Sequence, residues 1–250
     1  MPSRHLTLGW LMPNRTATDP SDRDSLPALG REVEVCRRCP RLVSWRESIA
    51  AEPPRRHRGE DYWARPITGF GDPDAAVVLT GLAPAANGAN RTGRIFTGDR
   101  SGDWLFAALH RCGFANQPQA TDRDDGLKLT GAYVTSVVRC APPANRPTPA
   151  ERDRCMTFLV RELRLLGRAR VLLALGGFGW DGALRAVREL GHEIPRPKPR
   201  FGHGAEVAVG PYVLLGTFHP SQQNTFTGRL TEPMLDQVLN RARAISLQPI

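Results

Sequence analysis

Short runs of hydrophobic residues, each bounded by glycine or proline, dominate the pattern of this 250-residue chain. They cover residues 75–82, 131–138, 170–176 and 211–218. Such runs are typical of strands covered on both faces of a sheet. Helical patterns lie at about 101–112, 149–166, 179–190 and 232–246. Because strands alternate with helices, we expect a three-layer α/β/α fold around a central, four-stranded and mainly parallel sheet.

The ends of the chain complete this organisation. Residues 1–25 are rich in Pro, Ser, Thr and Asp and are expected to form a loose N-terminal arm, with residues 26–250 as a single domain. The hydrophobic rhythm from Ser25 to Cys39 predicts a helix that delivers a pair of cysteines. Residues 205–209 and 211–218, joined by Gly210, form a local hairpin in an alternative interpretation of the last strand.

The composition adds a strong positive charge. The formal net charge is +9, and Lys occurs only at 128 and 198, so the basic residues are nearly all Arg. Part of this charge lies in a predicted basic loop at residues 50–66. A field of this sign attracts nucleic acid, although coding bias in a GC-rich genome produces the same excess of Arg. No hydrophobic run reaches membrane-spanning length and no signal peptide is evident, so a cytoplasmic protein without membrane partners is expected.

Four of the five cysteines suggest a metal centre. Cys36-x-x-Cys39 is a close pair, and Cys140 and Cys155 form a distant pair that only the fold can bring to it. Four thiolates suit either zinc or an iron–sulfur cluster, and the wide second spacing favours the cluster. Unrelated buried or disulfide-bonded cysteines are the alternative. Cys112 lies inside a hydrophobic helical pattern and is interpreted as core packing.

Three polar or glycine-rich segments begin where predicted strands end. They are GLAPAANGANRTGRIFTGD at 81–99, the segment that starts at Arg139, and the segment that starts at His219. The carboxyl ends of parallel strands form the ligand crevice of an open sheet, so these segments should converge on one site. Pro84 and the glycines of the first segment let the backbone approach a ligand closely. No phosphate-binding G-x-x-x-x-G-K-S/T motif is present, which argues against use of nucleoside triphosphates.

The polar loop after His219 carries three residues that we expect to be exposed: Phe226, Arg229 and Leu230. A hydrophobic tip flanked by Arg and Thr has the composition of a wedge that enters a base stack while its neighbours hold phosphates. In the alternative interpretation, Phe226 and Leu230 pack against the next helix.

These motifs carry a family resemblance. Together with the four cysteines, GLAPAANGANRTGRIFTGD, RCAPPANRPTPAE and HPSQQNTFTGRL resemble the type B (family 5) iron–sulfur uracil-DNA glycosylases, over about residues 30–245. The resemblance implies a [4Fe–4S] cluster held by Cys36, Cys39, Cys140 and Cys155. It also implies removal of uracil and other deaminated or damaged bases from DNA, with a range that includes hypoxanthine and ethenocytosine.

The resemblance also implies roles for single residues. Phe96 matches the aromatic side chain that stacks on the extruded base, and His219 would hydrogen-bond the base carbonyl as negative charge develops on it. The loop of Phe226, Thr227, Gly228, Arg229 and Leu230 would fill the gap left in the duplex. No Lys nucleophile lies near the motifs, so we expect water to attack without a Schiff-base intermediate.

Two departures from the wider superfamily are expected to shape the pocket. Ala83 stands in the motif where relatives carry an Asp, Asn or Glu that orients water, and Asn90 is our first candidate for that role. The neighbouring Pro84 is expected to line the base site. Ser136 stands where related enzymes carry a uracil-reading Asn, which agrees with a broad base range. Asn224, a further residue of the candidate base site, is expected to order the loop.

Two other functions fit parts of the sequence. One is a nucleic-acid-binding module with a metal staple and no catalysis, and the other is a cluster-bearing electron-transfer protein. The chain shows no flavin or nicotinamide motif, and hydrolysis needs no electrons, so we interpret the cluster as structural. The favoured interpretation is a monomeric, nucleoid-associated repair enzyme whose partner is damaged DNA.

Overall fold

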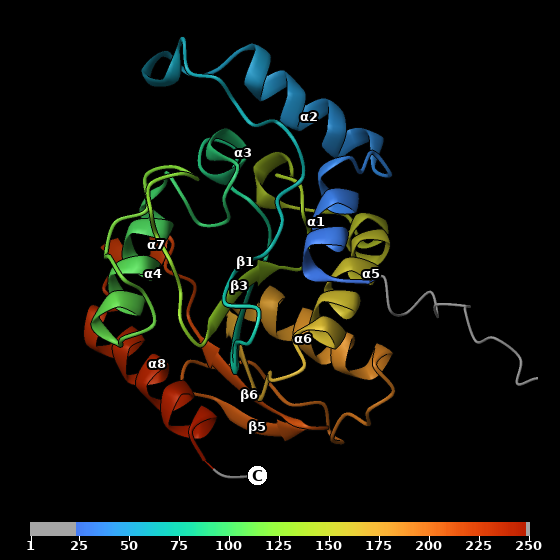
Figure 1. Cartoon of the computed structure of the whole chain (residues 1–250), viewed down its shortest axis with the longest axis vertical. Coiled ribbons are helices and arrows are strands. Elements are labelled where there is room, and N and C mark those ends of the chain that lie inside the picture. The colour runs from blue at the N-terminus through green and yellow to red at the C-terminus, as the bar shows by residue number, and fades with distance from the viewer. Residues whose placement is uncertain (1–23, 249–250) are drawn as a thin grey trace, which may run out of the picture.

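A six-stranded sheet forms the centre of the computed structural model, which describes residues 24–248 (Figure 1). The strand order is β1-β3-β2-β4-β6-β5. The bounds are β1 Phe70–Gly71, β2 Val77–Gly81, β3 Ala132–Ser136, β4 Val171–Leu175, β5 Glu206–Val209 and β6 Tyr212–Thr217. Residues 1–23 of the predicted N-terminal arm lie outside the described residues, and its last residue, Ser25, caps the first helix.

The four predicted strands are the four parallel strands in the middle of the sheet, β3, β2, β4 and β6. The prediction missed one short antiparallel strand at the edge, because β1 spans two residues and leaves no readable pattern. The other edge confirms the hairpin interpretation: β5 pairs antiparallel with β6, and Gly210 turns the chain with a φ of 56°. Side chains of β2, β3 and β4 are buried on both faces, as their composition predicts.

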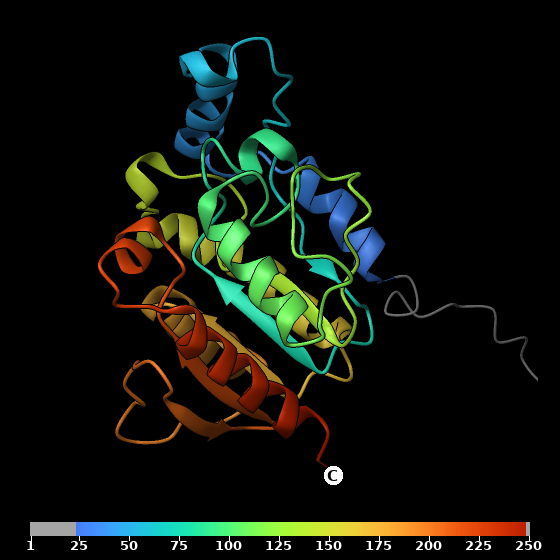
Figure 2. The same ribbon diagram turned by 90° about the vertical axis from the view of Figure 1, so that its left-hand side faces the viewer.

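Helices cover both faces of this sheet. The longer helices are α1 Leu26–Glu34, α2 Pro40–Ala51, α4 Arg100–Arg111, α5 Pro149–Leu165, α6 Gly177–Glu189 and α8 Glu232–Ser246. The short ones are α3 Ala89–Thr92, α7 Gln222–Phe226 and the 3₁₀ turns Arg55–His57 and Pro143–Asn145. Helices α4 and α8 pack side by side over one face, and α5 and α6 cover the other (Figure 2). The predicted three-layer α/β/α fold is confirmed.

The region around α1 and α2 differs most from the prediction. Helix α1 ends at Glu34, so Cys36 and Cys39 lie in a connection and not on the predicted helix. Helix α2 then begins at Pro40 and reaches into the segment that we expected to be a basic loop. Only Leu42, Val43 and Arg46 of α2 are buried, so the helix lacks the hydrophobic stripe by which helices are recognised.

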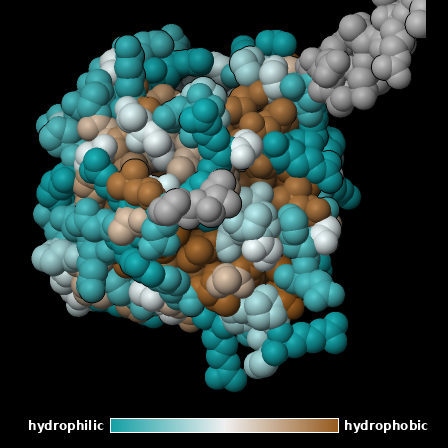
Figure 3. All heavy atoms as spheres, turned by 60° about the horizontal axis from the view of Figure 1, so that its bottom comes forward, coloured by the Kyte–Doolittle hydropathy of each residue, from teal (hydrophilic) through white to brown (hydrophobic). Residues whose placement is uncertain are grey.

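The end of the molecule away from α2 carries the chain's last described residues. This face is largely hydrophilic, with smaller hydrophobic areas between polar side chains (Figure 3). In residues 24–248, no helix is long and hydrophobic enough to cross a membrane.

Candidate active site

A cavity of about 290 Å³ lies at the carboxyl ends of the parallel strands. The segment after β2 forms one wall, and the segment after β6 contributes His219 and Ser221. Asn145, from the segment that follows β3, completes the lining. The three motif segments therefore converge on one site, as predicted from their positions at strand ends. The lining residues are Leu82, Ala83, Pro84, Ala85, Ile95, Phe96, Asp99, Ser101, Asn145, His219 and Ser221.

Two rings frame this cavity. The centroids of Phe96 and His219 lie 5.7 Å apart with an angle of 32° between the ring planes. Phe96 has a positive φ of 53°, which is unusual for a residue with a large side chain. A Cβ on Gly102 would lie 1.7 Å from the Phe96 carbonyl oxygen, so only glycine at 102 permits this backbone path. Phe96 is thus held in one place by its surroundings.

The backbone of His219 is fixed, whereas its ring is open to the cavity. Its carbonyl oxygen accepts hydrogen bonds from the Asn224 side-chain amide and from the Ser221 backbone, each at 2.8 Å. No hydrogen bond from residues 24–248 engages either ring nitrogen of His219. Burial lowers the pKa of His219 to about 4, so the imidazole is neutral at pH 7 and has one N–H to donate.

Two of the polar side chains that line the same cavity, those of Asp99 and Asn145, were not predicted as site residues. The Asp99 carboxylate caps α4 by accepting the Gly102 backbone N–H at 3.0 Å through one oxygen. Its other oxygen lies 2.1 Å from where a Cβ of Gly88 would be, so glycine at 88 makes room for it. Burial raises the pKa of Asp99 above its usual value. Asn145, with a φ of 55°, is the second group.

Three residues predicted for the base site lie outside the cavity lining: Asn90, Ser136 and Asn224, the last of which instead donates to the His219 carbonyl oxygen. The side chain of Asn90 is buried, and its amide donates to the carbonyl oxygens of Arg46 at 3.2 Å and Ala86 at 3.4 Å. This placement differs from the expected position beside the attacking water. Ser136 is also buried, and its hydroxyl donates to the Val138 carbonyl at 2.9 Å. Neither side chain is among the residues that line the cavity.

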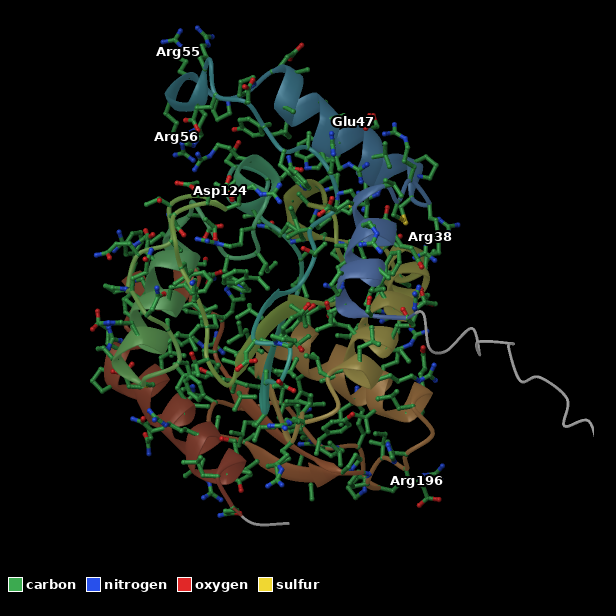
Figure 4. The ribbon with its side chains drawn as sticks, in the orientation of Figure 1. Arg38, Glu47, Arg55, Arg56, Asp124 and Arg196 are labelled. Carbon is green, nitrogen blue, oxygen red and sulfur yellow. The ribbon has the colours of Figure 1, made fainter. Side chains whose placement is uncertain are left out.

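A larger groove of about 770 Å³ adjoins the cavity. The two share Ala85, Asp99 and Asn145 as lining residues. Basic side chains along the groove are Arg56, His57, Arg91 and Arg100. Figure 4 shows Arg55 and Arg56 projecting from the 3₁₀ turn at the upper end of the molecule, within the predicted basic loop.

The loop after β6 corrects one prediction. Phe226, at the end of α7, is 67% exposed, and the Arg100 guanidinium lies 4.5 Å from the centre of its ring. Leu230 was expected to be exposed beside it, but its side chain is completely buried. Leu230 precedes Thr231, the N-cap of α8, and joins the same hydrophobic core as Leu235, four residues into the helix. This spacing is that of a hydrophobic staple, which fixes the start of a helix.

The structure gathers the four predicted metal ligands around a second, small cavity. Cys36 and Cys39 reach it from the connection between α1 and α2, Cys140 from the segment that follows β3, and Cys155 from α5. All four are free cysteines, as is Cys112, which is buried elsewhere in the core. The disulfide alternative is thus not seen.

Several of these sulfurs accept hydrogen bonds from nitrogen. The Arg46 guanidinium donates to Cys140 Sγ at 3.0 Å, the Arg139 backbone to Cys155 Sγ at 3.2 Å, and Arg38 to Cys36 Sγ at 3.4 Å. Cys39 occupies the N-cap position of α2, where the helix dipole favours negative charge, and its side chain makes no capping hydrogen bond. Donors of this kind suit thiolates, because a neutral thiol is a weak acceptor.

Burial raises the pKa of Cys140 to about 12, so a metal must displace its proton on binding. Among residues 24–248, no three His, Cys, Asp or Glu side chains form a group that holds a single metal ion. Zinc requires its four ligands to converge on one ion. The thiolates of an iron–sulfur cluster bind different iron atoms of a larger body, so they surround a space without meeting at one point.

Asp99, Asn145 and Arg46 were missed for different reasons. Asp99 precedes a helical pattern and was predictable as an N-cap, but nothing in the chain marks it as a cavity residue. Asn145 lies inside one of the three motifs, although its place on the cavity wall depends on the path of the chain after β3. Arg46 carries no local signal, because it belongs to a helix that the pattern does not reveal.

The sequence matches known proteins that agree with this geometry. Residues 68–243 match the family model of the uracil DNA glycosylase superfamily. A type-5 uracil-DNA glycosylase of Mycobacterium bovis is 51% identical over 224 residues, which is 89% of this chain and 82% of the relative. A type-5 uracil-DNA glycosylase of Thermus thermophilus is 46% identical over 222 residues, 88% of this chain and 97% of the relative.

A more distant relative separates the subgroups. The type-4 uracil-DNA glycosylase of Archaeoglobus fulgidus is 29% identical over 156 residues, covering 62% of this chain and 61% of the relative. The type-5 relatives match more of the chain at higher identity. The chain belongs to the uracil-DNA glycosylase superfamily, and within it to the type-5 family.

Proposed function

We propose that the protein removes uracil from DNA by hydrolysing the N-glycosidic bond, as the first step of base excision repair. The observation that carries the proposal is the cavity between Phe96 and His219, which opens into a basic groove. The names of the type-5 relatives support the same activity. A base inside a duplex cannot reach such a cavity, so the nucleotide must be flipped out of the stack.

The two rings divide the work of binding and activating the base. Phe96 offers a flat hydrophobic face on which the extruded base stacks. His219 donates its N–H to a carbonyl oxygen of the base, where negative charge develops as the glycosidic bond breaks. A neutral imidazole suits this role, since it donates a hydrogen bond without giving up a full proton to the departing base.

The attacking water must be held by cavity residues other than Phe96 and His219. Ala83 has no group to orient water, and Asn90, whose side-chain NH2 group donates to backbone carbonyls, does not line the cavity. We assign the water to Asp99 and Asn145, the carboxylate and amide that line the cavity. Neither Lys128 nor Lys198 lines the cavity, which supports water as the nucleophile and argues against a Schiff base.

The lining also supports a range of bases wider than uracil. Leu82, Ala83, Pro84 and Ile95 present hydrophobic surface, and the hydroxyl of Ser136 is turned to the backbone. No amide from that strand position reads the edge of the base. Discrimination between bases then depends mainly on the size of the base, its stacking on Phe96 and its contact with His219. Hypoxanthine and ethenocytosine can each satisfy some of these three conditions.

The groove and the α7 loop are proposed to bind the DNA backbone and fill the vacated stack. Arg56 and Arg100 line the groove, where their guanidinium groups would hold phosphates. Phe226 is the exposed hydrophobic group that enters the gap, and Thr227, Gly228 and Arg229 follow it on the surface. Leu230 takes no part in the wedge, because it is buried at the start of α8.

A [4Fe–4S] cluster is the proposed resident of the cysteine site, held by Cys36, Cys39, Cys140 and Cys155. The nitrogen donors around the sulfurs and the position of Cys39 at a helix N-terminus fit this group. Such a cluster ties α1, α2, β3 and α5 together by covalent bonds and supplies no step of the hydrolysis. We further propose that the protein works as a monomer in the cytoplasm, at the nucleoid.

An oligonucleotide assay tests the proposed function. Purified protein is incubated with DNA containing one uracil, and strand cleavage by alkali reports an abasic site. A parallel gel shift separates catalysis from binding without turnover, and attempted borohydride trapping checks for a Schiff base. The expected result is an alkali-labile product and no trapped complex. Binding to the uracil strand without product would favour the non-catalytic module.

The base range needs its own comparison. The same duplex carries hypoxanthine, ethenocytosine or hydroxymethyluracil at the position of uracil, with undamaged thymine and cytosine as controls. We expect product from several damaged bases and none from the controls. Activity on uracil alone would contradict the broad range and leave the proposed excision of uracil standing.

A further inference from the structure

Arg46 is the buried arginine whose charge lacks a carboxylate of its own. Three arginines are buried in residues 24–248: Arg46, Arg94 and Arg139. Arg94 pairs with Asp125 and Arg139 with Glu162, each with a nitrogen 2.6 Å from a carboxylate oxygen. The carboxylate beside Arg46 is that of Glu47 at 3.9 Å, and both oxygens of Glu47 already accept hydrogen bonds from Arg37.

The guanidinium of Arg46 instead faces the cysteine site. One terminal nitrogen donates to Cys140 Sγ at 3.0 Å, and both terminal nitrogens lie 3.5 Å from the Cys36 carbonyl oxygen. The side chain is only 3% exposed. A buried charge needs an opposite charge or a full set of hydrogen bonds, and thiolates bound to iron would supply the negative partner that the surrounding side chains lack.

The same residue also contacts the segment that forms the wall of the base cavity. Arg46 Nε donates to the Ala64 carbonyl at 3.0 Å, the Ala64 backbone N–H donates to the Asn90 carbonyl at 3.0 Å, and the Asn90 amide returns to the Arg46 carbonyl. This closed ring holds Ala64 at a positive φ of 49°. Asn90 extends it, because its backbone N–H bonds to the carbonyl of Ala85, which lines the cavity.

We propose that Arg46 is a positioning residue that joins the cysteine site to the base cavity. Its guanidinium balances the charge of the metal-bound thiolate at Cys140, and its ring of hydrogen bonds with Ala64 and Asn90 sets the position of the wall at Ala85. The proposal rests on the [4Fe–4S] cluster proposed above. It also explains why Asn90 is buried, since this side chain braces the cavity wall and does not hold the water.

The test compares Arg46→Met and Arg46→Lys with Arg37→Met, a control that removes an exposed arginine from the cysteine connection. Iron and sulfide per chain are measured, together with the half-life of the cluster's visible absorption under a chelator. Loss of an outer partner of a metal ligand typically costs about 10–100-fold in affinity. We expect a half-life at least about 10-fold shorter in Arg46→Met, an intermediate value in Arg46→Lys, and no change in the control.

A second readout follows the link to the cavity. Single-turnover excision of uracil is measured on the fraction of each variant that still carries iron, and we expect it to be slower in Arg46→Met than in Arg37→Met. If Arg46→Met fails to fold, the half-life in Arg46→Lys decides. Wild-type protein without iron would overturn the proposed cluster. Iron in the wild type with unchanged half-life and excision in the Arg46 variants would overturn this inference alone.

Discussion

The base cavity and the cysteine site are built by opposite means. The cavity lies at the ends of parallel strands, and its walls are continuous segments whose backbone is fixed by the sheet, by glycines and by caps. The cysteine site lies beside the sheet, where a connection, a strand end and a helix supply single side chains. The fold shapes the cavity except at the wall near Ala85, which Arg46 is proposed to brace, whereas the cysteine site depends on what binds the sulfurs. Changes in the cavity should therefore impair the reaction, and changes in the cysteine site should impair stability.

The largest expected effect is the loss of Cys140. In Cys140→Ala the Arg46 guanidinium remains buried without its sulfur partner, a change that typically costs about 3–5 kcal/mol of unfolding free energy. Urea unfolding and iron content measure the two consequences. Cys112→Ala is the matched control, since Cys112 is buried but lies in the core away from the site, and it should keep its iron. A stable, fully active Cys140→Ala protein without iron would contradict the claim that the cysteine site supports the stability of the protein.

Replacement of His219 is expected to impair the reaction and to leave stability unchanged. Replacing His219 with Ala removes the donor to the base carbonyl, and loss of one such donor slows a reaction by about 100–1000-fold. Thermal stability and iron content should stay close to wild type, because the ring nitrogens bond to no described residue. His110→Ala, an exposed change on α4, is the control. An excision rate equal to that of the control would remove His219 from the chemistry.

Two residues of the loop after β6 are expected to show smaller effects, one on DNA binding and the other on stability. Phe226→Ala should weaken binding to single-stranded and flipped DNA by about 1–3 kcal/mol, the usual cost of losing one stacking aromatic, while leaving stability unchanged. Leu230→Ala should do the reverse, because that side chain is completely buried. Fluorescence anisotropy with labelled DNA and urea unfolding measure the two. If both variants lose affinity equally, the wedge extends beyond Phe226.

An effect of similar size to that of Phe226 is expected in the pH dependence of stability, and it belongs to the cavity. Burial lowers the pKa of His219 from 6.5 to about 4. Between pH 6.5 and pH 4, His219 is therefore protonated in the unfolded chain and neutral in the folded protein. Stability from this source is therefore constant above pH 6.5 and falls as the pH drops toward 4. Wild type should lose more unfolding free energy than His219→Gln between about pH 7 and pH 5. Identical losses would mean that His219 titrates normally.

The difference between segments fixed by the sheet and contacts between single side chains also explains which features could be predicted from the sequence. The parallel strands and the long helices that cover them could be predicted from their hydrophobic patterns. The motifs at the strand ends could be predicted to converge, because the carboxyl ends of parallel strands lie at the same edge of the sheet. Helix α2 buries only Leu42, Val43 and Arg46, so no periodic pattern marks it. The exposure of Leu230 was misjudged because a staple before an N-cap and a surface tip look alike in a sequence.

Contacts between distant segments were the least predictable part. Asn90 was expected beside water because it lies in the pocket motif, but its amide faces a helix that was not foreseen. Arg46 and Cys140 lie 94 residues apart in the chain, and nothing local in either segment indicates the other. Charge pairing of this kind becomes visible only when the buried partners of each arginine are compared.

The most direct test of the central claim is a structure of the protein bound to DNA that carries a non-hydrolysable uracil nucleotide. We expect the uracil ring to stack on Phe96, with a carbonyl oxygen within hydrogen-bond distance of a His219 ring nitrogen and the phosphates along the groove that Arg56 and Arg100 line. A uracil that stays in the duplex, or is extruded to a site that neither Phe96 nor His219 contacts, would contradict the account.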